Sequence, residues 1–444
     1  MGENIFMTPT IMAIIMLTII ITGIFLKKIP VPLLLMIVPI ICALILGVSI
    51  EDLSTMSIDA LNSTMVSCGY MLLFGLLYFT MLQETGMFET LVDKFLSLTR
   101  GKINVYIVMI LTSILSCIGM LTATLVTGYL IVFPIMIPFY EKLKFDKKAV
   151  MIICQTALAA MCFLPWGIGM SVSAVFAGVD PMTLAKDVIP ISLCFIPVIV
   201  LQWIYFGRRH KAQGGIMKLD LSKEMSEVEA EIVATEDKPN ARPRKFWPNL
   251  IVFIGSIIGI AVFKIPAYLV FIVAVLLTTL INYPTPKEYQ PLWAKGGKTF
   301  FNTLIMLAGI SVFIGVFRGT GMVNGLAEVI VAIIPTALSR YMHIILLAIC
   351  TIVIHYVPYQ LYNSLYPILV SVGGSFGLTG SQVIAPFVTN VAFATGSSAL
   401  TPTTHVGTGL LNIDTDEYCK LSIKVLTVSN LLVIAIGMIF GAIK

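Results

Sequence analysis

Two clusters of small and hydroxylated residues interrupt apolar sequence in this chain of 444 residues. Residues 164–174 read LPWGIGMSVSA, and residues 394–409 read ATGSSALTPTTHVGTG. Proline removes a backbone donor and glycine allows unusual dihedral angles, so both clusters predict an interrupted helix. Unpaired backbone groups are costly at membrane depth, and a break survives there only inside protein or beside a cavity. We therefore interpret the two breaks as the place where a small solute binds.

The candidate binding residues lie at these breaks and at two predicted hairpin tips. Half-helix N-termini bind carboxylates through backbone N–H groups, while hydroxyls and freed carbonyls can replace the water around Na⁺. The candidates are Thr122, Thr124, Gly167 and Ser171 in the first half of the chain, and Asn363, Ser364, Ser397, Ser398, Thr401, Thr403 and His405 in the second. Small polar residues are also common where membrane helices pack closely, so packing is the alternative role for each residue taken singly.

Few ionisable side chains accompany these candidates. No Asp, Glu, Lys or Arg occurs in residues 103–140, 149–179 or 341–413. This pattern argues against a carboxylate proton relay and predicts neither a metal site nor catalytic residues. His355 and His405 remain, and either could take a proton or contact a carboxylate. A histidine that is hydrogen-bonded inside a helical bundle is the commoner case.

Composition places the breaks in a polytopic membrane protein. Hydrophobic residues make up 58% of the chain and charged residues 11%, and the mean hydropathy is +0.98, which leaves too little polar surface for a soluble fold of this length. The eight cysteines are scattered singly and predict no disulfide framework. Most of the 28 Lys and Arg residues fall on one predicted face. The positive-inside rule makes that face cytoplasmic, so the charge indicates orientation rather than binding to nucleic acid.

The apolar runs predict an all-α chain made of two repeats. Each repeat has about five transmembrane helices and one re-entrant hairpin, with a discontinuous helix at the centre. The first repeat covers residues 1–207, the second covers 248–444, and residues 208–247 form a hydrophilic cytoplasmic linker. The segment TGMFETLV from Thr85 is similar to TGMVNGLA from Thr320. An odd number of crossings in each repeat makes the second repeat inverted.

Three local expectations follow from the same pattern. The hairpin turn of the first repeat falls within residues 116–128, where the tip carries Thr122, Thr124 and Thr127. A loop with Glu51, Asp52 and Asp59 joins the second and third spans. Apolar residues at helical spacing among charges predict an interface helix over residues 87–102.

Three segments resemble the citrate–metal complex symporters of the ion transporter superfamily. They are LPWGIGMSVSAVFAGVDP from Leu164, FRGTGMVNGLAEVIVAIIP from Phe317 and LTPTTHVGTGLLNIDTDEYCKLSIK from Leu400, and the likeness covers nearly the whole chain in order. The resemblance implies inverted repeats around a carboxylate site, an elevator-like motion and coupling to H⁺ or Na⁺. The family pattern has an Asp-Gly-Asp-Gly-Thr run and an Asn-Asp pair at the hairpin tips, where this chain has IGMLTAT from Ile118 and YVPYQLYNS from Tyr356. A metal-free organic anion fits these residues better.

We expect a symporter of citrate or a related di- or tricarboxylate, multi-pass in the cytoplasmic membrane and working by elevator-type alternating access. It needs no cofactor beyond the coupling ion, H⁺ or Na⁺, and a homodimer is compatible with it. A cation/proton antiporter of the same superfamily is the alternative, and it would have to titrate His355 or His405. An intramembrane enzyme could use only Cys117 or Cys154 with His405, and no motif supports it. A channel would differ from a carrier in showing no counterflow.

Overall fold

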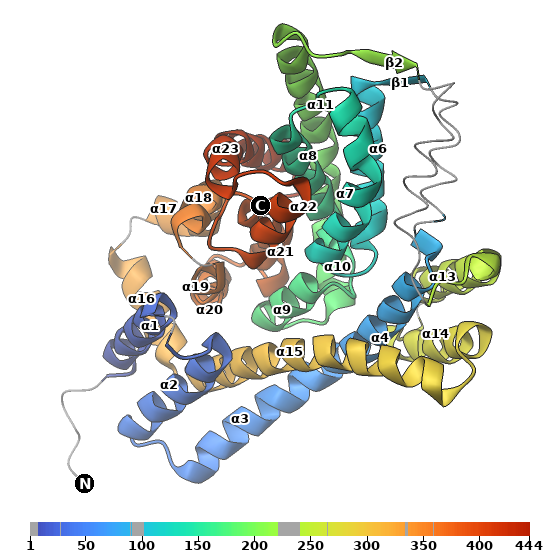
Figure 1. The fold of residues 1–444 in the computed structure, drawn as a ribbon. Helices are drawn as coiled ribbons and strands as arrows, with labels where there is room; N and C mark the ends of the chain where they lie inside the picture. Colours follow the sequence, from blue (N-terminus) through green and yellow to red (C-terminus); the bar gives the residue numbers. More distant parts are fainter. Residues whose placement is uncertain are drawn as a thin grey trace.

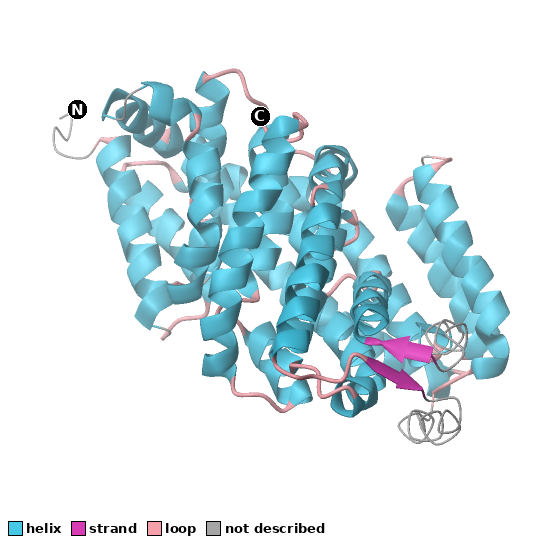
Figure 2. Ribbon diagram, turned by 90° about the horizontal axis from the view of Figure 1, so that it is seen from above, coloured by secondary structure: helices cyan, strands magenta, loops and turns pink. Residues whose placement is uncertain are grey.

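The computed structural model describes residues 8–26, 28–88, 90, 102–220, 240–263, 265–333, 336–357 and 359–444. Within these ranges the regular structure is helical apart from one short ribbon (Figure 2), in which β1 (Lys102–Asn104) pairs antiparallel with β2 (Lys218–Asp220). The all-α fold class is confirmed.

Helices make up most of the described chain before the linker. They are α1 (Pro9–Leu26), α2 (Val31–Ile45), α3 (Ile50–Thr64), the π-turn η1 (Met65–Gly69), α4 (Tyr70–Glu84), α6 (Val105–Met120), α7 (Leu125–Lys142), α8 (Lys147–Ala160), the 3₁₀ turn η2 (Met161–Phe163), α9 (Ile168–Ala177), α10 (Pro181–Leu193) and α11 (Phe195–Ala212).

A similar order follows the linker. The elements are η3 (Pro243–Lys245), α13 (Phe246–Ala261), α14 (Ala267–Asn282), α15 (Pro286–Gly319), α16 (Met322–Ile333), α17 (Thr336–Arg340), α18 (Met342–Tyr356), α19 (Tyr359–Asn363), α20 (Tyr366–Ser375), α21 (Gly380–Thr395), α22 (Pro402–Leu411) and α23 (Thr415–Ile439).

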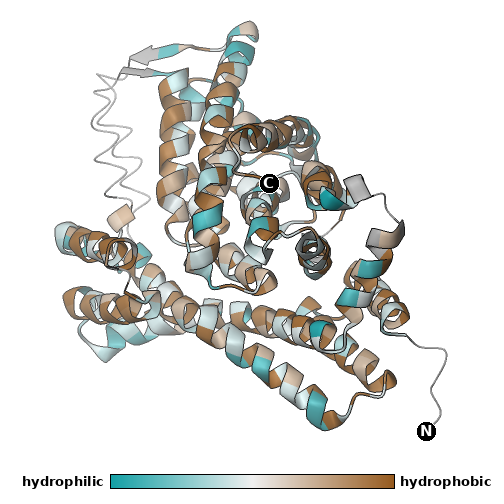
Figure 3. Ribbon diagram, turned by 180° about the vertical axis from the view of Figure 1, so that it is seen from behind, coloured by the Kyte–Doolittle hydropathy of each residue, from teal (hydrophilic) through white to brown (hydrophobic). Residues whose placement is uncertain are grey.

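The chain is an integral membrane protein. Four helical segments of the described residues are long and apolar enough to cross a membrane, or six if two bent pairs each count as one span. Many large apolar side chains face outward, among them Ile251 (68% exposed) on α13 and Leu280 (61% exposed) on α14. Figure 3 shows hydrophobic colour along the helices on the outside of the molecule. Such faces are stable against lipid tails and not against water.

The helices form two groups (Figure 1). Helices α1–α4 and α13–α16 make a long layer, here named the arm, and helices α6–α11 and α18–α23 make a bundle beside it. Within the arm, α15 packs closely on α2 and α3 because glycines let the backbones approach. A Cβ atom added at Gly309 would lie 2.7 Å from the carbonyl oxygen of Pro32, and one at Gly315 would lie 2.7 Å from that of Met56.

The two breaks and the hairpin turn fall where the sequence predicts them. Helix α8 and η2 end before Leu164, and α9 restarts after Gly167; α21 ends at Thr395, and α22 restarts after Thr401. Helices α6 and α7 pack against each other around a turn at residues 121–124. Both half-helices also end alike, in a left-handed residue followed two positions later by an Asp that caps the next helix. The recurrence of these features in both halves of the chain favours two repeats. The inverted orientation of the second repeat stays a prediction.

The predicted loop with Glu51, Asp52 and Asp59 is wrong. These residues lie in α3, which Ser49 caps by accepting a hydrogen bond from the backbone nitrogen of Asp52 at 3.0 Å. Acidic residues in a first turn stabilise the positive end of the helix dipole, so charge here marks a helix start rather than a loop. Most of the predicted interface helix at 87–102 lies outside the described residues.

Candidate functional site

A cavity of about 250 Å³, here named the central cavity, lies where the hairpin tips meet the two breaks. The first hairpin contributes the tip of α6 and the start of α7, and the first break contributes the start of α9. The second hairpin contributes α19 and the start of α20, and the second break contributes the ends of α21 and α22 that face each other. Its polar lining residues are Thr124, Ser173, Asn363, Thr395, Thr401 and Thr403.

Three helices begin at the central cavity. Its lining includes Thr124 and the first residues of α7, Ile168 and Gly169 at the start of α9, and Thr401 and Thr403 at the start of α22. The first N–H groups of a helix have no partner within the helix, and they lie at the positive end of its dipole. An anion in this cavity therefore meets the starts of three helices, although at α7 the Thr127 nitrogen already donates to the Thr124 hydroxyl at 3.2 Å.

The two half-helices differ from their neighbours in capping. No side chain caps α9 at Gly167 or α22 at Thr401. Neighbouring helices are capped by side chains that accept a backbone hydrogen bond, namely α8 by Asp146, α10 by Asp180, α21 by Thr379 and α23 by Asp414. No capping side chain therefore competes with a ligand for the first backbone donors of α9 and α22.

None of the described residues that line the central cavity carries a formal charge. The remaining wall is apolar and aromatic, with Ile168, Val172, Tyr359, Tyr366 and Phe387. Sequence reasoning missed these residues, because an apolar residue inside apolar sequence carries no signal of its own. A pocket with apolar walls and a few directed polar groups is typical of small-molecule sites.

The indole of Trp166 ties the first break to the first hairpin tip. Trp166 Nε1 donates to the carbonyl oxygen of Leu121 at 3.1 Å. Beside this carbonyl, Thr122 donates its hydroxyl to the oxygen of Gly119 at 2.8 Å, and Ala123 adopts a left-handed conformation with φ 73°. Thr122 and Gly167 thus shape the tip and the break without lining the cavity. Ser171, one turn into α9, is fully buried, and its hydroxyl has no partner among the described residues.

The second break is held to the second hairpin by His355. Its Nδ1 lies 2.5 Å from the oxygen of Ser397, so Nδ1 is the donor, and the Ser398 hydroxyl donates to the backbone oxygen of His355 at 3.4 Å. Ser397 also donates to the oxygen of Ala394 at 2.8 Å. These two serines are fully buried and satisfy backbone groups, so they support the break instead of lining the cavity.

Of the eleven candidates, the structure brings Thr124, Asn363, Thr401 and Thr403 to the central cavity. Ser364 lines an adjoining cavity of about 350 Å³ between α9, α15 and α19. His405 is exposed, and its Nε2 lies 2.6 Å from the oxygen of Ala399. The site also contains a buried acceptor without a hydrogen bond, because Asn363 Oδ1 has no partner among the described residues.

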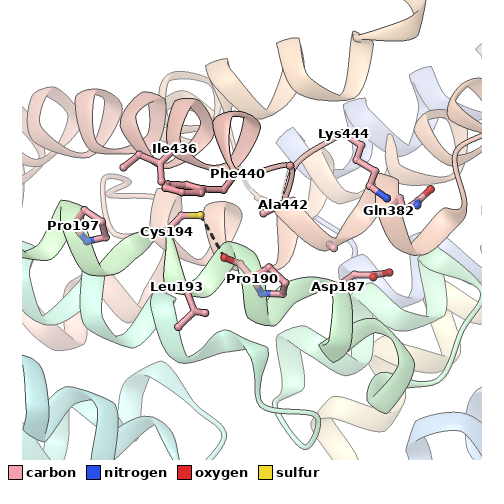
Figure 4. A pocket seen from close by; sticks show the side chains of 12 residues that line it. Asp187, Pro190, Leu193, Cys194, Pro197, Gln382, Ile436, Phe440, Ala442 and Lys444 are labelled. Atoms are coloured by element: carbon pink, nitrogen blue, oxygen red, sulfur yellow. Dashed lines mark hydrogen bonds between the residues drawn. The ribbon is translucent and has the colours of Figure 1, made fainter.

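A larger cavity of about 570 Å³ lies elsewhere, between α10, α21 and the end of α23. Asp187, Gln382 and Phe440 project around it in Figure 4. None of the candidate residues lines it, and the Asp187 carboxylate accepts a hydrogen bond from Ser381 at 2.5 Å. Convergence of both breaks and both hairpins, rather than volume, singles out the central cavity.

Comparison with known proteins shows the family of this chain. A family model described as "Citrate transporter" matches residues 15–395. A Bacillus subtilis (strain 168) protein named "Mg(2+)/citrate complex secondary transporter" is 25% identical over 439 residues, which cover 98% of this chain and 99% of that protein. Another from the same organism, named "Citrate transporter", is 24% identical over 412 residues, 90% of this chain and 92% of its own. Both relatives are named as transporters, not enzymes. This chain belongs to the citrate transporter family.

Proposed function

We propose that the protein is a secondary active transporter of citrate or a related di- or tricarboxylate, and that the central cavity holds this anion. The observation that carries the proposal is the convergence of three helix N-termini, two of them without a side-chain cap, on one cavity. Backbone N–H groups and helix dipoles bind carboxylates without a basic side chain. The hydroxyls of Thr124, Thr401 and Thr403 would orient the ligand.

Charge balance explains why such a carrier would be a symporter. Three helix ends supply roughly +1.5 charges in total, at about half a charge each. Fully ionised citrate brings three negative charges, and no basic side chain lines the cavity. Cations must therefore accompany the anion, as H⁺, as Na⁺ or as a metal ion that the citrate itself chelates. No Asp or Glu lines the cavity to bind a metal on the protein side, so we expect free citrate with H⁺ or Na⁺.

We further propose that alternating access moves the bundle against the arm. Both breaks and both hairpins belong to the bundle, whereas α15 and α16 of the arm contact it through α9 and α20. A carrier whose whole site sits in one group of helices can expose it to either side by an elevator-like shift of that group. The inverted repeats 1–207 and 248–444, the cytoplasmic linker 208–247 and a homodimer in the cytoplasmic membrane are part of this proposal.

The antiporter alternative has less support from the site. Its two histidines do not line the cavity, since His355 holds the second break and His405 is exposed. A proton antiporter needs a titratable group where its cation binds.

Uptake into proteoliposomes tests the proposal. Labelled citrate, succinate and tricarballylate are offered with and without Mg²⁺, under separate Na⁺ and H⁺ gradients. We expect gradient-driven citrate uptake without Mg²⁺, and acceleration of labelled uptake by unlabelled citrate preloaded inside. Uptake that requires Mg²⁺ would instead assign the metal complex as cargo. Absence of citrate transport under every gradient would contradict the proposal, and uptake without counterflow would indicate a channel.

A further inference from the structure

A polar cavity of about 450 Å³ lies between the arm and the C-terminal end of half-helix α9. We name it the Arg318 cavity. Its hydroxyls come from the end of α3, from η1 and from α15, and its cation is Arg318 near the end of α15. The polar lining residues are Ser63, Thr64, Ser67, Asp180, Ser311 and Arg318.

The Arg318 guanidinium keeps free donors. Its Nη2 donates to the oxygen of Phe176, in the last turn of α9, at 3.2 Å. A guanidinium has five N–H donors. Among the described residues no carboxylate lies within 4.0 Å of it, and the nearby Asp180 carboxylate instead accepts hydrogen bonds from the backbone nitrogen and hydroxyl of Thr183, at 3.0 and 2.6 Å. The cation therefore faces the cavity without a carboxylate partner.

Ordered hydroxyls line the same cavity as Arg318. Thr64 Oγ1 and Ser311 Oγ lie 2.6 Å apart and join α3 to α15, and both residues are buried. The π-turn η1 follows directly, and Ser67 on it donates to the oxygen of Thr64 at 3.3 Å. A π-turn within a helix is frequent at functional sites. The protons of these three hydroxyls are bound within the protein, since Ser311 also donates to the oxygen of Leu307 at 2.7 Å. The donors that suit a carboxylate group here are those of the Arg318 guanidinium.

The Arg318 cavity and the central cavity lie at opposite ends of one short helix. Residues Ile168 and Gly169 at the start of α9 line the central cavity, and Ala174, Val175 and Gly178 at its end line the Arg318 cavity. A helix of 10 residues is about 15 Å long. The central cavity offers no basic side chain, so Arg318 is the fixed cation that an anion meets next to the central site.

We propose that the Arg318 cavity is a second carboxylate-binding site, where the transported anion pauses on its path between solution and the central cavity. The identity of the anion rests on the proposed function, but the existence of the site does not. The cavity is lined by one cation and one carboxylate, and the Asp180 carboxylate is bound to Thr183, so the guanidinium is the group that attracts an anion here and raises its rate of arrival.

Arginine-specific labelling tests this site in the purified full-length protein. Phenylglyoxal modification of Arg318 is followed by mass spectrometry, with citrate present or with chloride at equal ionic strength. We expect citrate to slow modification of Arg318 severalfold while the modification rate of Arg340, which stacks over Tyr341 away from this cavity, stays unchanged. Equal rates at Arg318 with and without citrate would overturn the proposal.

A second variant separates the two sites. Gly169→Leu fills the central cavity, because nothing lies within 4 Å of the added Cβ atom and Gly169 lines that cavity. Citrate should still protect Arg318 in this variant; loss of protection would show that the effect is transmitted from the central cavity and would overturn the second site. If citrate protects Arg318 of the wild-type protein from modification but is not transported, the proposed function fails and the second site stands.

The transport kinetics of Arg318 variants test the same site by its effect on uptake. Arg318→Gln should raise the KM for citrate about tenfold at low salt, leave the maximal rate unchanged and flatten the salt dependence of KM. Arg318→Lys keeps the charge and should restore most of the salt dependence. Arg340→Gln is the control for removing a cation elsewhere on the protein. An equal fall of the maximal rate in both Arg318 variants, with KM unchanged, would indicate a purely structural contact with Phe176.

Discussion

The two broken helices share an architecture but have different surroundings. The first break touches the arm, since Trp166 stacks on Phe79 of α4 at a centroid distance of 5.8 Å and meets Phe271 of α14 edge-on at 5.9 Å. Its half-helix α9 also contacts α15. The second break stays within the bundle, where His355 holds it and α22 packs on α7.

This difference is informative for a carrier with two end states. If the repeats are inverted, the second break should take the place of the first against the arm once the bundle has moved. The contacts of Trp166 and Arg318 with the opposite group of helices would then belong to one end state only. The contacts of His355, which stay inside the bundle, would persist in both.

The largest expected effect comes from a bulky side chain at the start of the first half-helix. Gly169→Leu places its side chain in the central cavity and should abolish citrate uptake. Gly409, near the C-terminal end of the second half-helix, is the control position: it also has open space around an added Cβ atom, but it does not line the cavity. Gly409→Leu should keep uptake near the wild-type rate.

Thermal unfolding in detergent is the control for both glycine variants. Replacing an exposed helical glycine by leucine favours the helix by about 1 kcal/mol, so neither variant should unfold at a lower temperature. Equal loss of uptake in the two variants would mean that the central cavity is not the transport site.

A smaller effect is expected when the tie between the first break and its hairpin is cut. Trp166→Phe keeps an aromatic ring against Phe79 but removes the donor to the Leu121 oxygen. An unsatisfied buried carbonyl costs about 1–3 kcal/mol, so we expect uptake to fall about tenfold through distortion of the tip. Initial rates in proteoliposomes measure it, and a Trp166→Phe variant with wild-type uptake would show that stacking, not the hydrogen bond, positions the break.

The corresponding change at the second break should matter less. His355→Leu removes the imidazole donor to the Ser397 oxygen, but the bond from the Ser398 hydroxyl to the backbone of residue 355 remains. We expect uptake to fall about fivefold, which corresponds to about 1 kcal/mol, the low end of the cost of an unsatisfied buried carbonyl, because the neighbouring bond still ties the break to α18. A loss larger than that of Trp166→Phe would reverse the ranking of the two breaks and would favour a direct role of His355 in coupling.

The positions of the breaks could be predicted from the sequence because local backbone chemistry determines them. Pro165 and Pro402 cannot donate to a preceding turn, whatever packs around them. The glycines at the breaks contribute less than the sequence suggests, because Gly167 and Gly396 have ordinary φ angles of −69° and −66°. The fold class follows as directly from the apolar content. The apolar pattern indicates helix α15 only from about residue 300, because its first turns carry charged residues.

Which hydroxyls face the cavity could not be predicted. Ser397 and Ser398 look as suitable as Thr401 and Thr403, but the helix restarts at Pro402. The two serines therefore lie in the break and bind backbone oxygens, while Thr401 and Thr403 lie where the helix opens onto the cavity. Such phasing depends on tertiary contacts such as that of His355. The aromatic wall of Tyr359, Tyr366 and Phe387 likewise depends on how the second hairpin packs.

The smallest expected effect concerns strain at the first hairpin tip. Ala123 holds φ 73°, a left-handed conformation that costs an L-residue about 1–2 kcal/mol. Ala123→Gly removes this strain but makes the unfolded chain more flexible, so we expect a net stabilisation of about 0.5–1 kcal/mol in denaturant unfolding. The same substitution within a helix, Ala157→Gly in α8, should have the opposite sign, because glycine disfavours a helix interior by about 1 kcal/mol. If both variants are destabilised alike, the tip is not strained, and the first break is tied to an ordinary turn.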